Sequence, residues 1–350
     1  MSPDVAAVDL FCGVGGLTHG LERAGIPVAA GIEINLDCEY AYEENNDAEF
    51  VDEDVSELEA SDLSELYPDG ATKVLAGCAP CQPFSNLNNG TDTSVRDDYG
   101  LLESFGALVE DVQPEVVTME NVAEVRNESV YSDFVNTLFR EGYQIWFDKV
   151  SCPDYGIPQR RHRVVLLASK LGDISLIDPT HDPSDYPTVR EVIGDLPPLE
   201  AGEEHAEDHL HKSRTLVERN LKRIRQSLPG GTWRDWDQEL LLDCHRKESG
   251  RSFDSVYGRM EWDAPAPTMT TQFYNYGSGR FGHPEEDRAI SLREGAMLQT
   301  FPEDYAFVEE GEEVEFKKVG RMVGNAVPVR LGEAIGRSIA DHLEVHDVAA

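Results

Sequence analysis

Patterns typical of strands and helices alternate along the chain from Ala6 to Ser169. Short apolar segments such as Ala6–Phe11 and Val28–Glu33 predict buried strands, and the amphipathic segments between them predict helices. A helix that connects two neighbouring strands of one sheet makes those strands parallel. The alternation therefore predicts an α/β fold built on a doubly wound, mainly parallel sheet.

The remaining elements follow from the same patterns. Further strands are expected at residues 74–77, 115–119, 143–150 and 163–169, and helices at 17–25, 36–45, 101–112 and 131–141. The alternation stops near Ser169, and Asp178–Pro187 is a connector rich in proline and turn residues. Beyond it, Ser291 and Glu294 form a capping-box pattern, and a last helix is expected from about Pro328 to residue 343.

The chain of 350 residues is predicted to form two domains. Residues 1–180 plus 288–350 are expected to form the larger domain, and residues 181–287 a smaller, irregular, β-containing one. No apolar stretch of about 18 residues occurs, and the N-terminus lacks the features of a secretory signal. The six scattered cysteines are not needed as disulfide staples, so we expect reduced thiols and a cytoplasmic location.

The charge of the chain is extreme and uneven. The net charge is −37, yet residues 211–260 hold 11 Lys and Arg against 7 Asp and Glu. Only 8 of the 30 cationic residues are lysine. Such an acidic coat resembles proteins of salt-accumulating halophiles, in which molar salt screens the self-repulsion. An acidic mesophilic protein is the alternative. We therefore expect a high-salt cytoplasm, with folding and activity best in molar KCl.

A glycine-rich turn follows the first predicted strand. Gly13, Gly15 and Gly16 lack a Cβ atom, so backbone N–H groups and the next helix N-terminus can approach a ligand closely. The pattern differs from the dinucleotide-binding Gly-x-Gly-x-x-Gly, and a purely structural turn is the alternative. Glu33 ends the second strand, where it would accept ribose hydroxyls, and Asp54 would accept an adenine amino group. Because no phosphate-binding pattern is present, an adenosine without phosphates fits best, and S-adenosylmethionine is such a ligand.

One thiol, Cys81, lies between two prolines in the turn after the strand at 74–77. Cys78 and Cys81 have the spacing of half a zinc site or of a redox pair, but the sequence holds no second Cys-x-x-Cys or nearby His-x₃-His. A buried inert thiol is the other alternative. Glu120 also ends a predicted strand, and ligands bind at the carboxyl ends of strands in such sheets. The two residues together therefore predict a nucleophile and a carboxyl that act on one substrate.

A cationic run precedes the strand at 163–169. Strand alternation directs Arg161 and Arg163 to one side, and Arg160 and His162 to the other. A solvated face is the usual interpretation of such a run. In a chain this acidic, the run also suits an anionic backbone or a polar ring substituent.

Taken together, these segments resemble the DNA (cytosine-5) methyltransferase family. The matching motifs occur in the family's order over nearly the whole chain, at Asp9–Gly16, Gly77–Ser85, Glu120–Val122, Gln159–Arg163, Ser291–Pro302 and Gly324–Pro328. Cys12 stands where the family usually has alanine, and Met322 where glutamine is common; neither change removes a catalytic group. The resemblance implies a Rossmann-like, S-adenosylmethionine-dependent catalytic domain at 1–180 and 288–350, and a target-recognition domain at 181–287.

The resemblance also implies a mechanism. Cys81 attacks C6 of a cytosine that has flipped out of the duplex, and Glu120 protonates or hydrogen-bonds N3 and the exocyclic amine. C5 then takes the methyl group of S-adenosylmethionine, which leaves as S-adenosylhomocysteine. A base acting through water removes the C5 proton, and β-elimination releases Cys81. Arg163 contacts O2 of the ring and Arg161 positions Glu120. Cys78 is interpreted as a turn residue without a chemical role.

The same motifs imply the cofactor site and the partners. The residues expected to line the cofactor site are Phe11, Gly13, Gly15, Gly16, Leu17, Glu33, Ile34, Asp54, Val55, Pro80, Leu101, Asn325 and Val327. No metal is expected. The expected partner is double-stranded DNA, bound by a monomer, while any companion restriction endonuclease acts separately and no membrane is contacted. Trp233 and Trp236 are expected to pack in a core or a domain interface rather than on bases.

Two other functions remain open from the sequence. One branch of the same fold methylates C5 in tRNA with the same Cys and Glu, although the long basic segment favours duplex DNA. A DNA-binding regulator that keeps the fold without catalysis would be expected to lack a catalytic residue. Cys81, Glu120, Arg161 and Arg163 are all present.

Overall fold

The computed structural model describes residues 5–80, 100–247 and 254–347. By compactness the chain divides into two units. The first unit comprises residues 1–155, 162–180 and 326–350, and the second comprises 156–161 and 181–325. The expected domain boundaries place residues 156–161 and 288–325 with the catalytic part instead. The expected boundaries stay a prediction.

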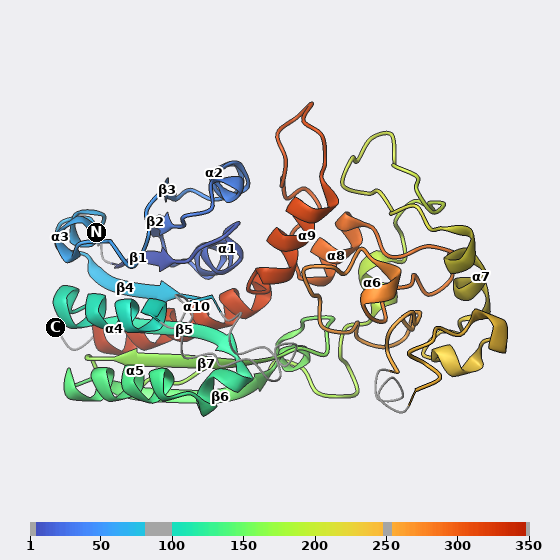
Figure 1. Cartoon of the computed structure of the whole chain (residues 1–350). Coiled ribbons are helices and arrows are strands. Elements are labelled where there is room, and N and C mark those ends of the chain that lie inside the picture. Colours follow the sequence, from blue (N-terminus) through green and yellow to red (C-terminus); the bar gives the residue numbers. More distant parts are fainter. Residues whose placement is uncertain (1–4, 81–99, 248–253, 348–350) are drawn as a thin grey trace. The chain divides into compact units, whose positions relative to one another are not determined.

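The described part of the first unit contains one sheet of seven strands, in the order β3-β2-β1-β4-β5-β7-β6 (Figure 1). Its strands are β1 Val5–Leu10, β2 Val28–Ile32, β3 Glu49–Val51, β4 Thr72–Gly77, β5 Val116–Val122, β6 Gln144–Ser151 and β7 His162–Ser169. The pairs from β3 through to β5 are parallel, whereas β7 runs antiparallel to both β5 and β6. The predicted α/β fold with a mainly parallel sheet is confirmed.

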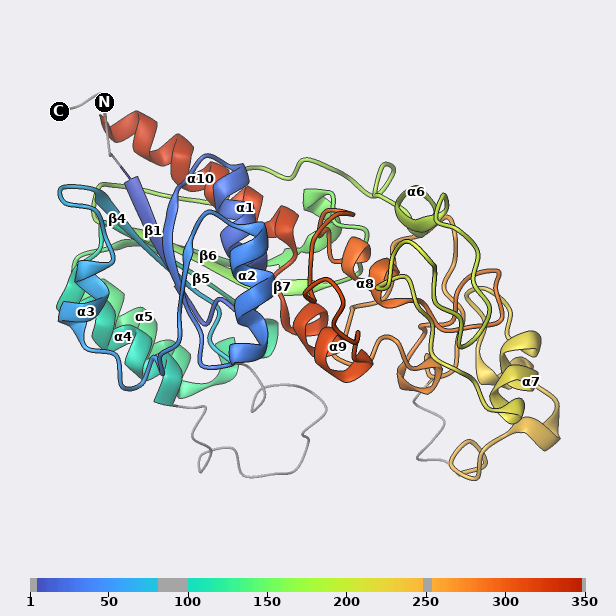
Figure 2. The ribbon, with the colours of Figure 1, turned by 90° about the horizontal axis from the view of Figure 1, so that it is seen from above.

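Helices cover both faces of this sheet (Figure 2). One face packs its side chains, including those of Val8, Leu75 and Val117, with the buried residues of α4 and α5. The helices of this unit are α1 Gly16–Arg23, α2 Glu39–Asn45, α3 Ala60–Glu65, α4 Gly100–Val112, α5 Ser129–Arg140 and α10 Val329–Asp347. Helix α3 was not expected from the sequence, because it is only six residues long and shows little apolar periodicity.

Helices α1 and α10 lie against each other at very short range. A Cβ atom on Gly20 would lie 2.5 Å from backbone atoms of Val329 and Glu333, so only glycine allows this approach. The contact brings the segment before α10 to the start of α1, although about 300 residues separate them in sequence. Helix α10 therefore packs beside the glycine-rich turn that precedes α1.

The second unit is built from short helices and irregular segments. Its α-helices are α6 Val189–Ile193, α7 Glu218–Gln226, α8 Leu292–Leu298 and α9 Phe316–Asn325. Its described residues contain isolated β-bridges, such as Arg259 with Gly282, in place of extended strands. Trp233 and Trp236 are each 5% exposed and form a small core with Leu240, which confirms that they pack inside the protein.

The capping box expected at the start of α8 is confirmed. The Ser291 side chain accepts a hydrogen bond from the Glu294 backbone N–H at 3.1 Å, and Glu294 Oε2 accepts one from the Ser291 N–H at 2.6 Å. These bonds satisfy donors that the first turn of a helix otherwise leaves unpaired.

Candidate functional site

The candidate site lies at the carboxyl ends of four neighbouring parallel strands, β3, β2, β1 and β4, and of β5 beside them (Figure 1). The chain leaves β1 at Phe11, β2 at Glu33 and β4 at Cys78, and Glu120 lies within β5, shortly before its end at Val122. In an open α/β sheet, ligands bind at this edge because the connecting loops and helix N-termini face it. The topology thus brings Phe11 and Glu33, two of the predicted cofactor residues, and the predicted catalytic glutamate to one edge of the sheet.

The glycine-rich turn has a backbone that most side chains would not tolerate. Gly13 and Gly15 have φ angles of 54° and 83°, and Phe11 adopts a φ of 60°, which residues with a side chain seldom occupy. A Cβ atom on Gly16 would lie 2.3 Å from the Val327 carbonyl oxygen. Gly16 and Val327, both predicted to line the cofactor site, are therefore in direct contact in the structure.

The Glu33 carboxylate bridges this turn to the second strand. Its Oε2 accepts a hydrogen bond from the Gly13 N–H at 3.2 Å, and its Oε1 accepts one from the Asn35 N–H at 2.9 Å. Burial raises the pKa of Glu33, while these backbone donors oppose the shift. Each oxygen keeps a lone pair that can accept a ligand hydroxyl.

The other predicted cofactor residues have varied environments. Ile34 is 64% exposed next to Glu33, which leaves an apolar surface at this edge. Asp54 Oδ1 accepts hydrogen bonds from the backbone N–H and the hydroxyl of Ser56, at 2.8 and 2.7 Å. Leu17 and Val55 are buried in the first unit, and Pro80 and Leu101 are half-buried. Asn325, the exposed last residue of α9, belongs to the second unit.

Asp9 is a buried acid beneath the glycine-rich turn that the sequence did not single out. Its Oδ2 accepts a hydrogen bond from the Thr18 hydroxyl at 2.8 Å, and its Oδ1 is buried without a hydrogen-bond partner. Burial raises the pKa of Asp9 to about 7, against the opposing effect of Thr18. Because the shift needs full burial under a helix start, no signal in the sequence could have revealed it.

We predict that Asp9 makes the stability of the protein depend on pH. The folded state binds the Asp9 proton more tightly than the unfolded state does, because the pKa of Asp9 is higher in the folded state. The protonated carboxyl group therefore stabilises the folded state fully below about pH 4, and this stabilisation is lost as the pH rises through 7. The Asp9→Asn variant cannot lose a proton there. The unfolding free energy of Asp9→Asn minus that of the wild type should therefore increase with pH, by at most about 1.4 kcal/mol for each pH unit between pH 5 and 7. Urea denaturation at fixed salt measures this difference, and parallel curves would contradict it.

Glu120 is the buried centre of the predicted catalytic group. It lies in β5 with its side chain 2% exposed, and its Oε1 is 2.9 Å from Nε of Arg163 in β7. Its Oε2 accepts a hydrogen bond from the Cys78 thiol at 3.0 Å. The expectation that Cys78 is an inert turn residue overlooked this bond. The sequence alone does not reveal this bond, because it depends on the register of β4 against β5. In that register Gly77 pairs with Met119, so the residues that follow them, Cys78 and Glu120, lie next to each other.

The arginine that contacts Glu120 is the one expected to contact the cytosine ring. Arg163 forms the ion pair with Glu120, whereas Arg161 Nη1 donates to the Met269 carbonyl oxygen at 3.1 Å within the second unit. Arg161 is 2% exposed, and Gln159 next to it accepts a hydrogen bond from the Met269 N–H at 2.7 Å. The separate roles predicted for the two arginines stay predictions.

The predicted nucleophile, Cys81, lies outside the described residues, as do the loop residues that follow it up to residue 99. The structure describes the preceding segment, Cys78–Pro80, which leaves β4. The Cys78 N–H donates to the Leu10 carbonyl oxygen at 3.2 Å, and Asn121 Nδ2 donates to the Ala79 carbonyl oxygen at 3.2 Å. The start of the predicted nucleophile loop is thus tied to both β1 and β5.

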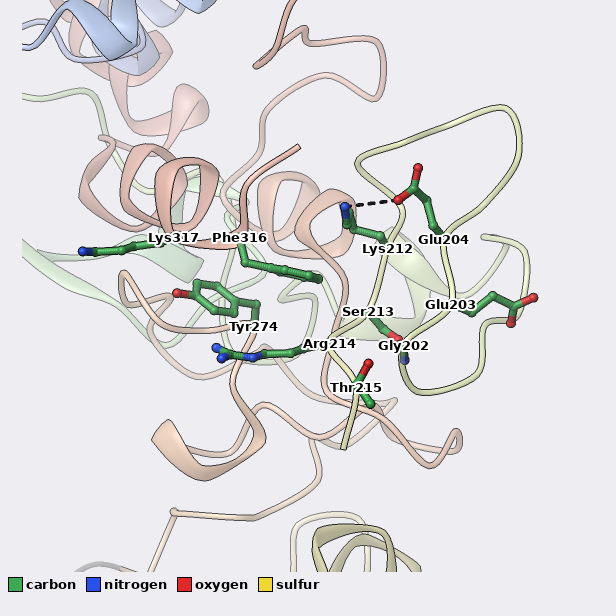
Figure 3. A pocket seen from close by; sticks show the side chains of 10 residues that line it. All are labelled: Gly202, Glu203, Glu204, Lys212, Ser213, Arg214, Thr215, Tyr274, Phe316 and Lys317. Carbon is green, nitrogen blue, oxygen red and sulfur yellow. Dashed lines mark hydrogen bonds and ion pairs between the residues drawn. The ribbon is translucent and has the colours of Figure 1, made fainter. Parts of the chain in front are cut away.

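The second unit carries a groove of about 470 Å³ (Figure 3). Its lining residues are Gly202, Glu203, Glu204, Lys212, Ser213, Arg214, Thr215, Tyr274, Phe316 and Lys317. Cations and aromatic rings are stacked along one wall. The Arg214 guanidinium lies 5.7 Å from the centre of the Tyr274 ring, which lies 5.4 Å from the Phe316 ring, and Lys212 Nζ lies 5.4 Å from Phe316 on the other side. Tyr274 is buried and Phe316 is half-buried, so this wall presents its cations rather than open ring faces to a ligand.

Across residues 5–80, 100–247 and 254–347, no group of three or more His, Cys, Asp or Glu side chains is placed to hold a metal ion. Over the same residues, no helix is both long and apolar enough to cross a membrane.

Comparisons with known proteins agree with the geometry. Residues 5–341 match the family model of the C-5 cytosine-specific DNA methylases. The chain is 51% identical over 342 residues to the Type II methylase M.HgiDII of Herpetosiphon aurantiacus, covering 97% of this chain and 96% of that protein. The Type II methyltransferase M.Sau96I of Staphylococcus aureus is 28% identical, covering 97% of this chain and 76% of its own.

A solved structure agrees in fold. The structure of a DNA modification methyltransferase encoded within an Escherichia coli prophage superimposes with a TM-score of 0.75 at 22% identity, covering 97% of this chain and 100% of that one. This likeness confirms the α/β methyltransferase fold. Since the family model and the Herpetosiphon relative each span nearly the whole chain, the protein belongs to the family of C-5 cytosine-specific DNA methylases and is a DNA (cytosine-5-)-methyltransferase.

Proposed function

We propose that this enzyme transfers the methyl group of S-adenosylmethionine to C5 of a flipped-out cytosine in duplex DNA, as the methylase of a restriction-modification system. Cys81 is the nucleophile and forms a covalent bond to C6. The observation that carries the proposal is the buried Glu120 carboxylate, held by Arg163 and Cys78 at the ligand-binding edge of the sheet. A buried charge is retained when it is paired, and this one stands where a substrate ring would be held.

The residues of the glycine-rich turn fit S-adenosylmethionine. Glu33 has lone pairs for the two ribose hydroxyls, exposed Ile34 offers an apolar surface to an adenine ring, and the turn presents backbone N–H groups without Cβ atoms. When bound, this cofactor supplies an electrophilic methyl group. Val327 packs directly against Gly16 of the turn.

Glu120 has a defined task in this proposal. Cytosine is a poor acceptor for a thiolate at C6, because negative charge then develops on N3. A carboxyl group that protonates or hydrogen-bonds N3 and contacts the exocyclic amine stabilises that charge in the transition state. Arg163 holds Glu120 and supplies a cation beside the ring. Cys81 then leaves by β-elimination when the C5 proton is lost, so the thiol is regenerated.

Labelled methyl transfer tests the proposal directly. The protein is incubated in molar KCl with S-adenosylmethionine carrying a labelled methyl group, and with duplex DNA or tRNA in parallel reactions. Label is expected in DNA, and bisulfite sequencing of the product should map it to C5 of cytosine within one short sequence. Label in tRNA alone would refute the proposal and show an RNA methyltransferase. DNA binding without label in either nucleic acid would instead show a DNA-binding regulator without catalytic activity.

We further propose that DNA phosphates contact the groove of the second unit. Arg214 and Lys317 are exposed there, while Lys212 is paired with Glu204 at 3.1 Å. In Figure 3 the ammonium of Lys317 extends away from the Lys212–Glu204 pair. In a chain of net charge −37, exposed cations such as Arg214 and Lys317 suit the phosphates of a polyanion, and Glu203 and Glu204 on the same groove limit where such a chain can pass.

Replacing Lys317 by alanine is expected to weaken duplex binding and to change its salt dependence. If Lys317 neutralises one phosphate, the slope of log affinity against log salt becomes less negative by about 0.9. Fluorescence anisotropy with a labelled duplex at several KCl concentrations measures the slope. Lys170→Ala is the matched control, because this lysine of the first unit lies outside the groove and beside the start of β5, where its N–H donates to the Glu115 carbonyl oxygen at 2.9 Å. Equal slopes for wild type and Lys317→Ala would refute the contact.

A further inference from the structure

Cys78 contacts the predicted catalytic carboxylate, and the sheet itself puts it there. In the parallel pair of β4 and β5, Gly77 lies opposite Met119, so the next residues, Cys78 and Glu120, emerge side by side. The Cys78 Sγ to Glu120 Oε2 distance is 3.0 Å. A thiol is a weak donor, and it is directed here at an acceptor that is 2% exposed.

The position of Cys78 is set by neighbouring strands. Its N–H donates to the Leu10 carbonyl oxygen of β1 at 3.2 Å, which continues the β1–β4 pairing by one residue. The adjoining Ala79 carbonyl oxygen accepts from Asn121 Nδ2 at 3.2 Å. Two strands thus hold the backbone on either side of the thiol, so that the thiol is presented to Glu120 in a fixed place.

The carboxylate needs a second contact to have one orientation. Arg163 Nε lies 2.9 Å from Oε1 and therefore holds one of the two oxygens. The terminal torsion of a glutamate is broad, so a carboxylate held at one oxygen can still rotate. With the thiol on Oε2, the plane of the carboxylate is defined by contacts on both sides.

We propose that Cys78 is a positioning residue that orients Glu120 for the cytosine ring, an inference that rests on the proposed function. In the free enzyme the thiol occupies Oε2. When the base enters, its exocyclic amino group is a stronger donor than the thiol and takes over the oxygen that the thiol has held in place, while N3 accepts from the protonated carboxyl group. The thiol neither bonds to the substrate nor carries a proton in the reaction.

The Cys78→Ala and Cys78→Ser variants differ by one hydroxyl and separate this role from a structural one. Alanine removes the donor, and we expect a decrease in kcat of about tenfold with KM for DNA and for S-adenosylmethionine unchanged, the size of one modest hydrogen bond. Serine keeps a donor and should recover most of kcat. Thermal unfolding should be the same for both variants. Cys244→Ala, which removes an exposed thiol in the second unit, should match the wild type.

The outcomes distinguish this inference from the proposed function. Wild-type protein that methylates cytosine, with Cys78→Ala as fast as the wild type, would overturn the positioning role alone. Serine and alanine variants that are equally slow would also overturn it, because the donor would then not matter. Wild-type protein that transfers no methyl group to DNA would instead refute the proposed function.

Discussion

Replacing Cys81 by serine is expected to abolish methyl transfer while S-adenosylmethionine still binds. The proposed reaction needs a nucleophile that adds to C6 and later leaves, and a thiolate does both near neutral pH, whereas a hydroxyl is scarcely ionised there. Loss of a covalent nucleophile lowers kcat on the order of 10⁴-fold or more. Single-turnover transfer of labelled methyl to duplex DNA measures the loss, and equilibrium dialysis with labelled cofactor measures binding.

The control for this experiment is a serine at another thiol. Cys244→Ser changes an exposed cysteine of the second unit and should leave both measurements at the wild-type value. A Cys81→Ser protein that turns over at the full rate would rule out the covalent mechanism. Loss of cofactor binding together with activity would show that Cys81 has a structural role instead.

The largest expected effect on stability comes from Glu294 in α8. Its carboxylate forms two parallel hydrogen bonds with Arg288, at 2.7 and 2.8 Å, and both side chains are 1% exposed. Glu294→Gln keeps the shape but leaves the Arg288 cation with Glu286 as its remaining carboxylate partner, at 2.7 Å. Breaking a buried ion pair on one side costs about 3–5 kcal/mol, and we expect about 3 kcal/mol because Glu286 stays. Urea denaturation in molar KCl measures the loss.

The pH dependence of this effect has a definite sign. Burial opposes ionisation of Glu294, but the charge and hydrogen bonds of Arg288 outweigh it and lower the pKa to about 2. The contribution of Glu294 is therefore complete above about pH 4.5 and is lost as the pH falls toward 2. The difference between wild type and Glu294→Gln should shrink in acid.

A double variant separates the lost pair from lost packing. Arg288→Met with Glu294→Leu removes both charges and fills the space with apolar atoms, which commonly restores the stability that a half-broken pair loses. We expect the double variant to be more stable than Glu294→Gln. A Glu294→Gln protein as stable as the wild type would show that the pair contributes nothing.

Local patterns were a good guide to the elements of this protein. The first strand was expected at residues 6–11 and lies at Val5–Leu10, and the helix expected at 101–112 is α4, Gly100–Val112. The reason is physical, since buried strands and amphipathic helices must repeat apolar residues with their own periods. Short α3 carries too few turns for such a period to be visible.

Contacts between distant residues were beyond those patterns. The bond from Cys78 to Glu120 depends on the register of β4 against β5, and the contact of Gly16 with Val327 joins the two ends of the first unit. The buried, unpaired oxygen of Asp9 depends on α1 lying over it. Each requires several elements to be placed within a few tenths of an ångström, which the identity of a residue does not encode.

The sequence by itself determined the α/β fold, the family and the chemical types at the site, because periodicity and ordered motifs are properties of the chain. The tertiary structure alone decided which groups meet. Arg163, rather than a residue adjacent in sequence, pairs with Glu120, and a cysteine without an evident role supplies its second contact. Ion pairs and hydrogen bonds act over about 3 Å, and only packing of the sheet brings residues 42 positions apart within that distance.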